Sequence, residues 1–169
     1  MTSWSEINVA SNRSLAGKIA IVIGSSRGMG RAIAQRLGQE GATVIVTYLT
    51  NSAGAAEVVQ AIQRNGSEAV AVQVDMREVA SVRQLFEQVL ARFKRIDILI
   101  NNAFGNIVLK PTKEMLQEDY DSMFDITRGV YFALQEAALH LASGGRIISI
   151  STALTITSRP TAGAYIGCK

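Results

Sequence analysis

Short aliphatic runs alternate with longer amphipathic segments along this chain, and that alternation limits the folds that the chain can adopt. Each run is too short for a helix of usual length, is rich in β-branched residues and is bounded by turn residues, so each predicts a buried strand. The five runs are KIAIVIG, ATVIVTY, EAVAVQVD, IDILINNA and GRIISIS. Between them, apolar residues recur at helical spacing, which predicts four helices at about residues 29–40, 53–65, 79–94 and 117–142.

Nearly all-apolar strands that alternate with helices indicate a parallel sheet covered on both faces, because crossovers of one hand place helices on either side. We therefore expect a doubly wound α/β fold. The chain has 169 residues, of which 48% are hydrophobic and 18% charged, and this suits one domain that buries a core. We expect a poorly ordered polar tail over residues 1–14 and a single domain over residues 15–169.

Charge and composition disfavour several classes of function. The formal net charge is only +3, and the basic residues are scattered, so we expect neither nucleic-acid nor membrane binding. No apolar run reaches the length of a membrane span, and the polar start lacks the hydrophobic stretch of a signal peptide, which predicts a cytoplasmic protein. Because Cys168 and His140 are the one cysteine and the one histidine, we expect no internal disulfide and no metal site.

Glycines follow the first predicted strand directly. Ligands of doubly wound sheets bind beyond the carboxyl ends of the strands, and there the stretch GSSRGMG places Gly24, Gly28 and Gly30 ahead of a predicted helix. Glycines let the backbone turn tightly and approach a ligand, while a helix start offers free N–H groups and the positive end of a dipole. These features favour a pyrophosphate site, with a plain glycine-rich turn as the alternative.

The next two strand ends bear on which nucleotide would bind. The stretch VIVTYLTNS has no carboxylate to bond the ribose 2′-hydroxyl of NAD, and Arg27 can meet a 2′-phosphate. This favours NADP(H), with NAD(H) as the second candidate and a solvated surface charge as the alternative role of Arg27. Asp75 ends the third predicted strand. With Glu78 it also has the spacing of a helix capping box, so Asp75 can serve both as a helix cap and as a nucleotide-binding residue.

The stretch AYIGCK places Tyr165 and Lys169 one helical turn apart. A phenol can donate or accept a proton, and a neighbouring ammonium favours its ionised form, so the pair suits general acid–base chemistry. Chance alone can also produce such a pair. The other motifs of the chain decide between these two interpretations.

Five motifs follow one another at regular intervals over residues 15–169. They are LAGKIAIVIGSSRGMGRAIAQRL, VDM, LINNA, GRIISIST and the tyrosine–lysine pair. With these motifs the chain resembles the short-chain dehydrogenase/reductase family, in particular its 3-oxoacyl-carrier-protein-reductase-like members. The resemblance implies a Rossmann-like fold and an NAD(P)-dependent oxidoreductase that moves a hydride between nicotinamide and a carbonyl or secondary alcohol carbon. It also implies a small-molecule substrate and homo-oligomers.

The resemblance further implies roles for individual residues. Tyr165 would be the proton donor or acceptor, and Lys169 would favour its phenolate form and hold the nicotinamide ribose. Thr152 matches a family serine that bonds the substrate oxygen, and either Thr152 or the adjacent Ser151 would take that role. The residues that match cofactor-binding positions are Gly24, Ser26, Arg27, Gly28, Met29, Gly30, Asp75, Met76, Asn102 and Ala103, together with Tyr165 and Lys169.

Several departures from the family pattern put turnover in question. Ile23 replaces a threonine before the first glycine, and Phe104 replaces the glycine of the NNAG motif, with Gly105 following. Ile126 stands in place of the catalytic asparagine, unless that residue is deleted. Family members usually continue well beyond the lysine, so we expect a fold that is incomplete at the C-terminus. A catalytically silent nucleotide-binding module, or an inactive fragment of such an enzyme, is therefore the second hypothesis.

Overall fold

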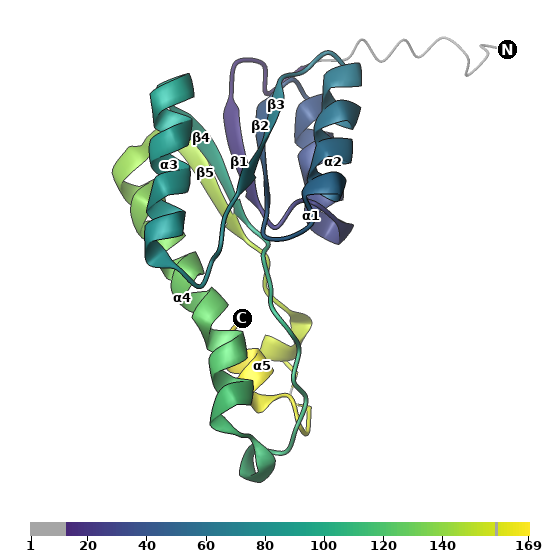
Figure 1. Ribbon diagram of the computed structural model, residues 1–169, viewed down its shortest axis with the longest axis vertical. Coiled ribbons are helices and arrows are strands. Elements are labelled where there is room, and N and C mark those ends of the chain that lie inside the picture. Colours follow the sequence, from purple (N-terminus) through teal and green to yellow (C-terminus); the bar gives the residue numbers. More distant parts are fainter. Residues whose placement is uncertain (1–12, 158) are drawn as a thin grey trace, which may run out of the picture.

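The computed structural model describes residues 13–157 and 159–169, which form one parallel sheet flanked by helices (Figure 1). The strands are β1 (Ile19–Ile23), β2 (Thr43–Tyr48), β3 (Ala69–Gln73), β4 (Ile96–Asn101) and β5 (Leu141–Ser149). The helices are α1 (Gly28–Gln39), α2 (Ser52–Arg64), α3 (Val79–Phe93), α4 (Gln117–His140) and α5 (Gly163–Gly167), with 3-10 turns η2 (Thr112–Glu114) and η3 (Ala153–Thr155). All predicted strands and helices are present, in the predicted order.

The sheet has the strand order β3-β2-β1-β4-β5, and all neighbouring strands are parallel. In the central strand, Ile21 pairs with Ile45 of β2 and with Leu99 of β4. The chain winds outward from β1 to one edge and then returns to build the other edge. This reversal is the switch point at which doubly wound sheets bind ligands. The predicted doubly wound α/β fold is confirmed.

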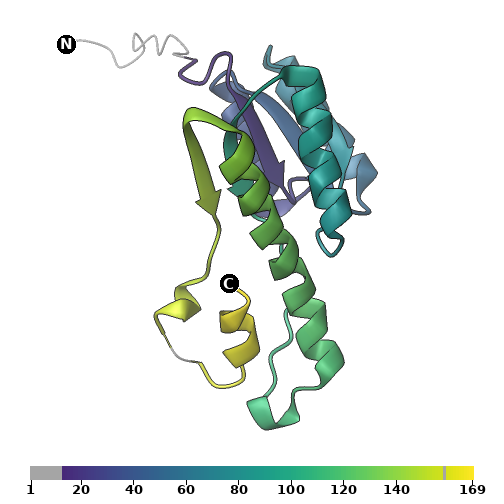
Figure 2. The same ribbon diagram turned by 90° about the vertical axis from the view of Figure 1, so that its left-hand side faces the viewer.

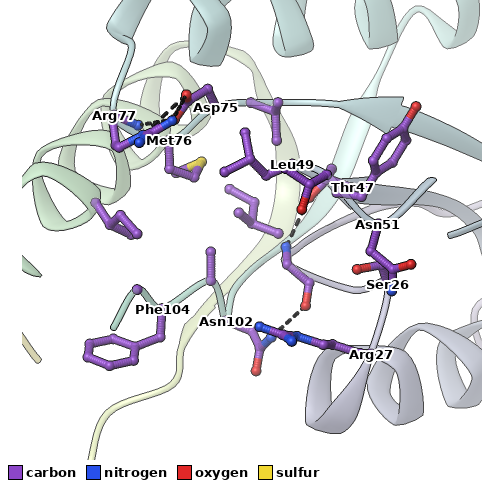
Figure 3. A pocket seen from close by; sticks show the side chains of 18 of the residues that line it. Ser26, Arg27, Thr47, Leu49, Asn51, Asp75, Met76, Arg77, Asn102 and Phe104 are labelled. Atoms are coloured by element: carbon purple, nitrogen blue, oxygen red, sulfur yellow. Dashed lines mark hydrogen bonds and ion pairs between the residues drawn. The ribbon is translucent and has the colours of Figure 1, made fainter. Parts of the chain in front are cut away.

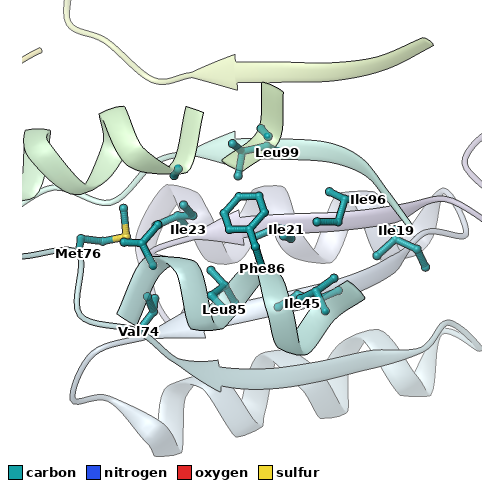
Figure 4. Packing of buried hydrophobic residues seen from close by; sticks show 14 residues of the cluster. Ile19, Ile21, Ile23, Ile45, Val74, Met76, Leu85, Phe86, Ile96 and Leu99 are labelled. Atoms are coloured by element: carbon teal, nitrogen blue, oxygen red, sulfur yellow. The ribbon is translucent and has the colours of Figure 1, made fainter. Parts of the chain in front are cut away.

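The two faces of the sheet pack into two separate cores, because successive side chains of a strand point to opposite faces. On one face, Ile21 packs with Leu85 and Phe86 of α3 (Figure 4). On the other face, Ala20 and Val22 pack with residues of α1 and α2. Figure 1 shows α1 and α2 on one side of the sheet and α3 and α4 on the other. Burial on both sides explains why the central strands are apolar along their whole length.

The last strand differs most from its predicted bounds. β5 begins at Leu141, within a segment predicted to end a helix, and it ends at Ser149. Its register with β4 shifts near its start. Gly144 lies at φ +75°, and a Cβ on Gly145 would lie 2.8 Å from the carbonyl oxygen of Asp97. Two adjacent glycines in a sequence usually indicate a loop, but here they permit an irregularity within the strand.

The N-terminal half of helix α4 extends beyond the carboxyl ends of the strands, and α5 lies beside it there (Figures 1 and 2). The hydroxyl of Thr127 on α4 donates to the carbonyl oxygen of Cys168 at 2.9 Å. Nearer the sheet, α4 crosses the backbone of Met76 at Gly129, where a Cβ would overlap the Met76 carbonyl oxygen. These contacts hold the last residues of the chain at the same end of the sheet as the glycine loop.

Residues 1–12 of the predicted polar tail lie outside the described residues. Arg13 and Ser14, the last two residues of the predicted tail, contact the domain. Arg13 Nη2 donates to Asn65 O at 2.6 Å, and Ser14 Oγ donates to Glu40 Oε2 at 3.0 Å. Among the residues described, no helix is long and apolar enough to cross a membrane. In the same part of the chain, no cluster of three or more histidine, cysteine or acidic side chains is placed to hold a metal ion.

Candidate functional site

A cavity of about 620 Å³ opens at the carboxyl ends of the strands, beside the switch point (Figure 3). Its walls come from the loops after β1 and β4, the ends of β2 and β3, and the first half of α4. Figure 3 shows Ser26, Arg27 and Asn51 on one side of this cavity and Phe104 on the other. The predicted cofactor-binding residues that line it are Gly24, Ser26, Arg27, Gly28, Asp75, Met76, Asn102 and Ala103.

The glycine loop packs backbone against backbone on the loop after β4. Gly24 lies at φ +74°, and a Cβ there would lie 2.8 Å from Ala103 Cα. A Cβ on Gly30 would lie 2.5 Å from the side-chain nitrogen of Asn102, which donates to Gly24 O at 3.0 Å. Only glycine fits at these two positions. Gly30 does not line the cavity, but its close packing against Gly24 and Asn102 fixes the shape of the loop.

A buried threonine, which the sequence analysis missed, fastens the loop to β2. The side-chain oxygen of Thr47 accepts from Gly24 N at 2.9 Å, and Thr47 N donates to Ser25 Oγ at 2.9 Å. Ser25 Oγ donates in turn to Val22 O at 2.7 Å. These hydroxyls stabilise the loop, to which the preceding Ile23 supplies no hydroxyl. A hydroxyl residue near the carboxyl end of a largely aliphatic strand was the available sequence signal, because a buried polar group needs a hydrogen-bond partner.

The start of α1 suits an anion. Arg27 is the N-cap residue, its side chain caps no N–H group, and the first turn holds no acidic residue. A helix N-terminus of this kind attracts negative charge through its free N–H groups and dipole. Arg27 lines the cavity and is exposed, whereas Arg31 is paired with Glu57 at 3.1 Å. Met29, the next predicted residue, is 59% exposed and does not line the cavity.

Asp75 is bound by an arginine that the sequence analysis did not single out. Its carboxylate accepts from Arg77 N at 2.9 Å and from the guanidinium at 2.9 and 2.6 Å. The hydrogen bond from the guanidinium lowers the pKa of Asp75 below its ordinary value. The capping-box interpretation is wrong, because Glu78 is the N-cap residue of α3 and makes no side-chain capping bond. Both members of the Asp75–Arg77 pair line the cavity.

A smaller cavity of about 130 Å³ lies between the ends of β4 and β5, the middle of α4 and the end of the chain. Lys169 and Asn101 line it, whereas Tyr165 lines neither cavity. Asn101 is buried, its side-chain nitrogen donates to Ser149 Oγ at 3.4 Å, and its side-chain oxygen accepts no hydrogen bond from the described residues. Lys169 therefore shares a small cavity with an amide oxygen that can still accept a hydrogen bond.

Phe104 lies against both members of the tyrosine–lysine pair. Its ring meets the Tyr165 ring edge to face, with centroids 5.3 Å apart. Lys169 Nζ lies 4.1 Å from the centroid of the same ring. Burial lowers the pKa of the Lys169 ammonium below its ordinary value. The structure thus brings the pair together around an aromatic side chain, and not directly on the large cavity.

The two candidate hydroxyls after β5 differ in what they bond. Ser151 Oγ donates to the carbonyl oxygen of Lys169 at 3.1 Å. Thr152 Oγ1 accepts from Leu154 N at 3.4 Å, as the N-cap of η3. The Ser151 proton is therefore engaged, whereas the Thr152 hydroxyl can still donate.

On α4, Ile126 is the residue that the sequence analysis aligned with the family's asparagine, unless that asparagine is deleted. Ile126 lines both cavities, and its Cδ1 would lie 2.7 Å from a Cβ on Gly105. The polar link from α4 to the end of the chain comes instead from its neighbour Thr127, which donates to Cys168 O. The helix therefore offers the lysine segment a hydroxyl and an apolar wall.

Comparison with known proteins gives one family. The family model that describes short chain dehydrogenases matches residues 18–169. A curated relative, the hydroxynaphthalene reductase-like protein Arp2 of Metarhizium acridum (strain CQMa 102), is 42% identical over 159 residues, covering 93% of this chain. The aligned region is 59% of that relative's own length, so the chain spans less than two thirds of it.

Solved structures agree with this match. A short chain dehydrogenase from Burkholderia cenocepacia J2315 in complex with NADP superposes with a TM-score of 0.86 at 37% identity, covering 92% of this chain and 64% of that one. The landomycin C-6 ketoreductase LanV with bound NADP and rabelomycin superposes with a TM-score of 0.85 at 37% identity, covering 92% of this chain and 66% of that one.

Proposed function

Because the chain belongs to the short chain dehydrogenase family, we propose that it binds a nicotinamide cofactor in the large cavity and acts as an oxidoreductase. Its reaction moves a hydride between that cofactor and the carbon of a carbonyl or secondary alcohol. The observation that carries the proposal is the glycine loop, which packs at Gly24 and Gly30 against Ala103 and Asn102 and leads into the free N–H groups of α1. The bound nicotinamide supplies the redox chemistry, and the chain binds and orients it.

The preferred cofactor is NADP(H), with NAD(H) as the second candidate. Arg27 lines the cavity and forms none of the ion pairs made by the described residues, so its guanidinium is free to meet a phosphate. The opposite stretch, residues 47–51, carries no carboxylate that would repel one. The Burkholderia enzyme and LanV, both similar to this chain, were solved with NADP.

Tyr165 is the proposed acid or base, and Lys169, whose ammonium contacts the same Phe104 ring, is its proposed partner. Thr152 is the proposed donor to the substrate oxygen, because its hydroxyl proton is free while that of Ser151 bonds Lys169 O. A donor at that oxygen stabilises the charge that develops on it during reduction. Ser151 is then the residue that fastens the lysine segment to the end of β5.

The substrate is proposed to be a small carbonyl or alcohol compound. Two similar proteins are named for ring-bearing substrates, a hydroxynaphthalene reductase-like protein and a C-6 ketoreductase solved with rabelomycin. An activity screen should therefore include fused-ring ketones beside simple aliphatic ones.

We also propose a cytoplasmic protein whose domain spans residues 15–169 and which associates with copies of itself. Tyr131 and Leu139 of α4, 65% and 69% exposed, are apolar surface for such contacts.

Calorimetric titration of NADPH and then NADH into the 169-residue chain tests cofactor binding. We expect NADPH to bind more tightly, and Arg27→Ala to weaken NADPH about tenfold or more while leaving NADH nearly unchanged, because a charge-assisted hydrogen bond is lost. Arg31→Ala is the matched control, since Arg31 is already paired with Glu57. An equal loss for both nucleotides would refute the NADP preference, and binding of neither would refute the cofactor site.

Oxidation of NADPH in the presence of the ketone panel tests turnover. We expect Tyr165→Phe to lower kcat at least a hundredfold, because the proton donor is lost.

The same assay separates the alternative of a silent nucleotide-binding module. The observations that favour this alternative are that Tyr165 lines neither cavity and that the aliphatic side chain of Ile126 lines both. Cofactor binding without turnover of any ketone would select it.

A further inference from the structure

Phe104 is the side chain that touches both Tyr165 and Lys169. Lys169 Nζ lies 4.1 Å from the Phe104 ring centroid, and the Tyr165 ring meets it at an interplanar angle of 84°. From these contacts we propose that Phe104 is a positioning residue, which holds the Lys169 ammonium and the Tyr165 ring in one cluster. This inference rests on the proposed function, because positioning matters for turnover only if this pair performs the acid–base step.

The backbone on both sides of Phe104 is held tightly. On one side, a Cβ on Gly24 would lie 2.8 Å from Ala103 Cα. On the other side, a Cβ on Gly105 would lie 2.7 Å from Ile126 Cδ1 and 3.2 Å from the carbonyl oxygen of Ser122. Both neighbours of Phe104, Ala103 and Gly105, therefore pack closely against another segment of the chain. The ring is therefore presented to the end of the chain from a fixed point.

The ammonium of Lys169 lies in surroundings that disfavour its charge, because burial lowers its pKa. Among the described residues it forms no ion pair. The titratable groups on its own segment are the Cys168 thiol and the Tyr165 hydroxyl, and Asp125 on the adjacent α4 is paired with Arg128 at 3.1 Å. The negative face of the Phe104 ring is the group that offsets the burial of the charge.

Phe104 also separates the two cavities. It lines both, together with Ala103 and Ile126, whereas Lys169 lines only the smaller one. The side chain of Ile126 offers the lysine no hydrogen bond from α4. The Phe104 ring thus contacts the ammonium at this point of the chain, and it keeps the ammonium and the Tyr165 ring in one cluster.

The contact can be tested in the wild-type chain without cofactor. Reductive methylation with ¹³C-formaldehyde labels each lysine with a dimethyl group and keeps its charge, and Lys169→Arg identifies the Lys169 signal. We expect the Lys169 methyl protons to be shifted upfield by the ring current and to show cross-relaxation to phenylalanine ring protons. A Lys169 signal at the position of a solvent-exposed lysine overturns the proposal.

Titration of that signal in variants tests whether the aromatic face matters. In Phe104→Leu we expect the acid dissociation constant of the ammonium to rise about three- to tenfold, the typical worth of a partly buried cation–π contact. In Phe104→Tyr, which keeps the ring, we expect the wild-type value. Phe93→Leu removes a comparable contact, 5.0 Å from Arg92, and serves as the distant control. No change in Phe104→Leu, or equal changes in the leucine and tyrosine variants, overturns the proposal.

Turnover then links the contact to function. We expect Phe104→Leu to lower kcat and to shift the pH profile of kcat, and Phe104→Tyr to keep both. The magnetic resonance result does not depend on turnover. A chain with the predicted lysine signal but without activity refutes the proposed function alone, whereas an active chain whose Lys169 signal is unshifted refutes the positioning role alone.

Discussion

At the scale of single residues, the glycine loop depends on a hydroxyl that lies outside its own motif. Thr47 is fully buried in β2, accepts from Gly24 N and donates to Val22 O at 3.2 Å. It therefore joins the end of β1 to β2 through a side chain. Removing one partner of a buried hydrogen bond leaves the other group without a bond and without water.

We expect Thr47→Val to destabilise the chain by about 1–3 kcal/mol and to weaken NADPH binding, because Gly24 N and Val22 O lose a buried partner. Urea unfolding and calorimetry measure the two effects. Thr43→Val, on the same strand but partly exposed, is the matched control. Equal effects of the two substitutions would contradict a special role of Thr47 in the loop.

At the scale of elements, α4 connects the sheet to the residues proposed for catalysis. Its path depends on Gly129, which lies against the backbone of Met76 after β3, and on Thr127, which bonds Cys168 O. The helix thus brings together the end of β3 and the end of the chain. A change at its crossing point should be felt at both.

Gly129→Ala should destabilise the chain by about 1–3 kcal/mol, because the new methyl group overlaps a backbone oxygen that cannot move aside easily. Gly163→Ala in α5 is the matched control, since the nearest atom to its Cβ would be Thr112 Oγ1 at 3.6 Å. There, alanine should be neutral or slightly stabilising, because it lowers the entropy of the unfolded chain. Urea unfolding of both variants measures the contrast, and the same sign for both would contradict it.

At the scale of the whole molecule, the two ends of the sheet differ in role. The carboxyl ends of the strands carry the cavities, and the opposite end is tied together by Asp97, which is 3% exposed. Asp97 accepts from Ile19 N at 3.0 Å, from Arg95 at 2.9 and 2.5 Å, and from Lys18 at 3.4 Å. Burial alone would raise the pKa of Asp97, but these hydrogen bonds hold it below its ordinary value.

A carboxyl whose pKa is lowered by folding stabilises the fold above its unfolded pKa, about 3.9, and this stability is lost as the pH falls through the folded pKa. Asp97→Asn should therefore destabilise the chain at pH 7 by about 1.5–3 kcal/mol, the worth of hydrogen bonds to a charged group. The difference from wild type should shrink below about pH 4. Urea unfolding across this range checks the trend. A pH-independent difference, or an equal effect of Glu68→Gln in the half-exposed pair with Arg92, would contradict it.

The order of strands and helices, the doubly wound sheet and the place of the glycine loop were determined by the sequence alone. They follow from local periodicity and from the conformational needs of glycine, which neighbouring residues decide. The arrangement around the tyrosine–lysine pair was decided only by the tertiary structure. The clamp of Thr47, the bond of Arg77 to Asp75 and the place of Phe104 beside Lys169 depend on how side chains meet. The partners of Thr47 and of Phe104 lie far from them in the chain, and a sequence pattern does not show which distant side chains will meet.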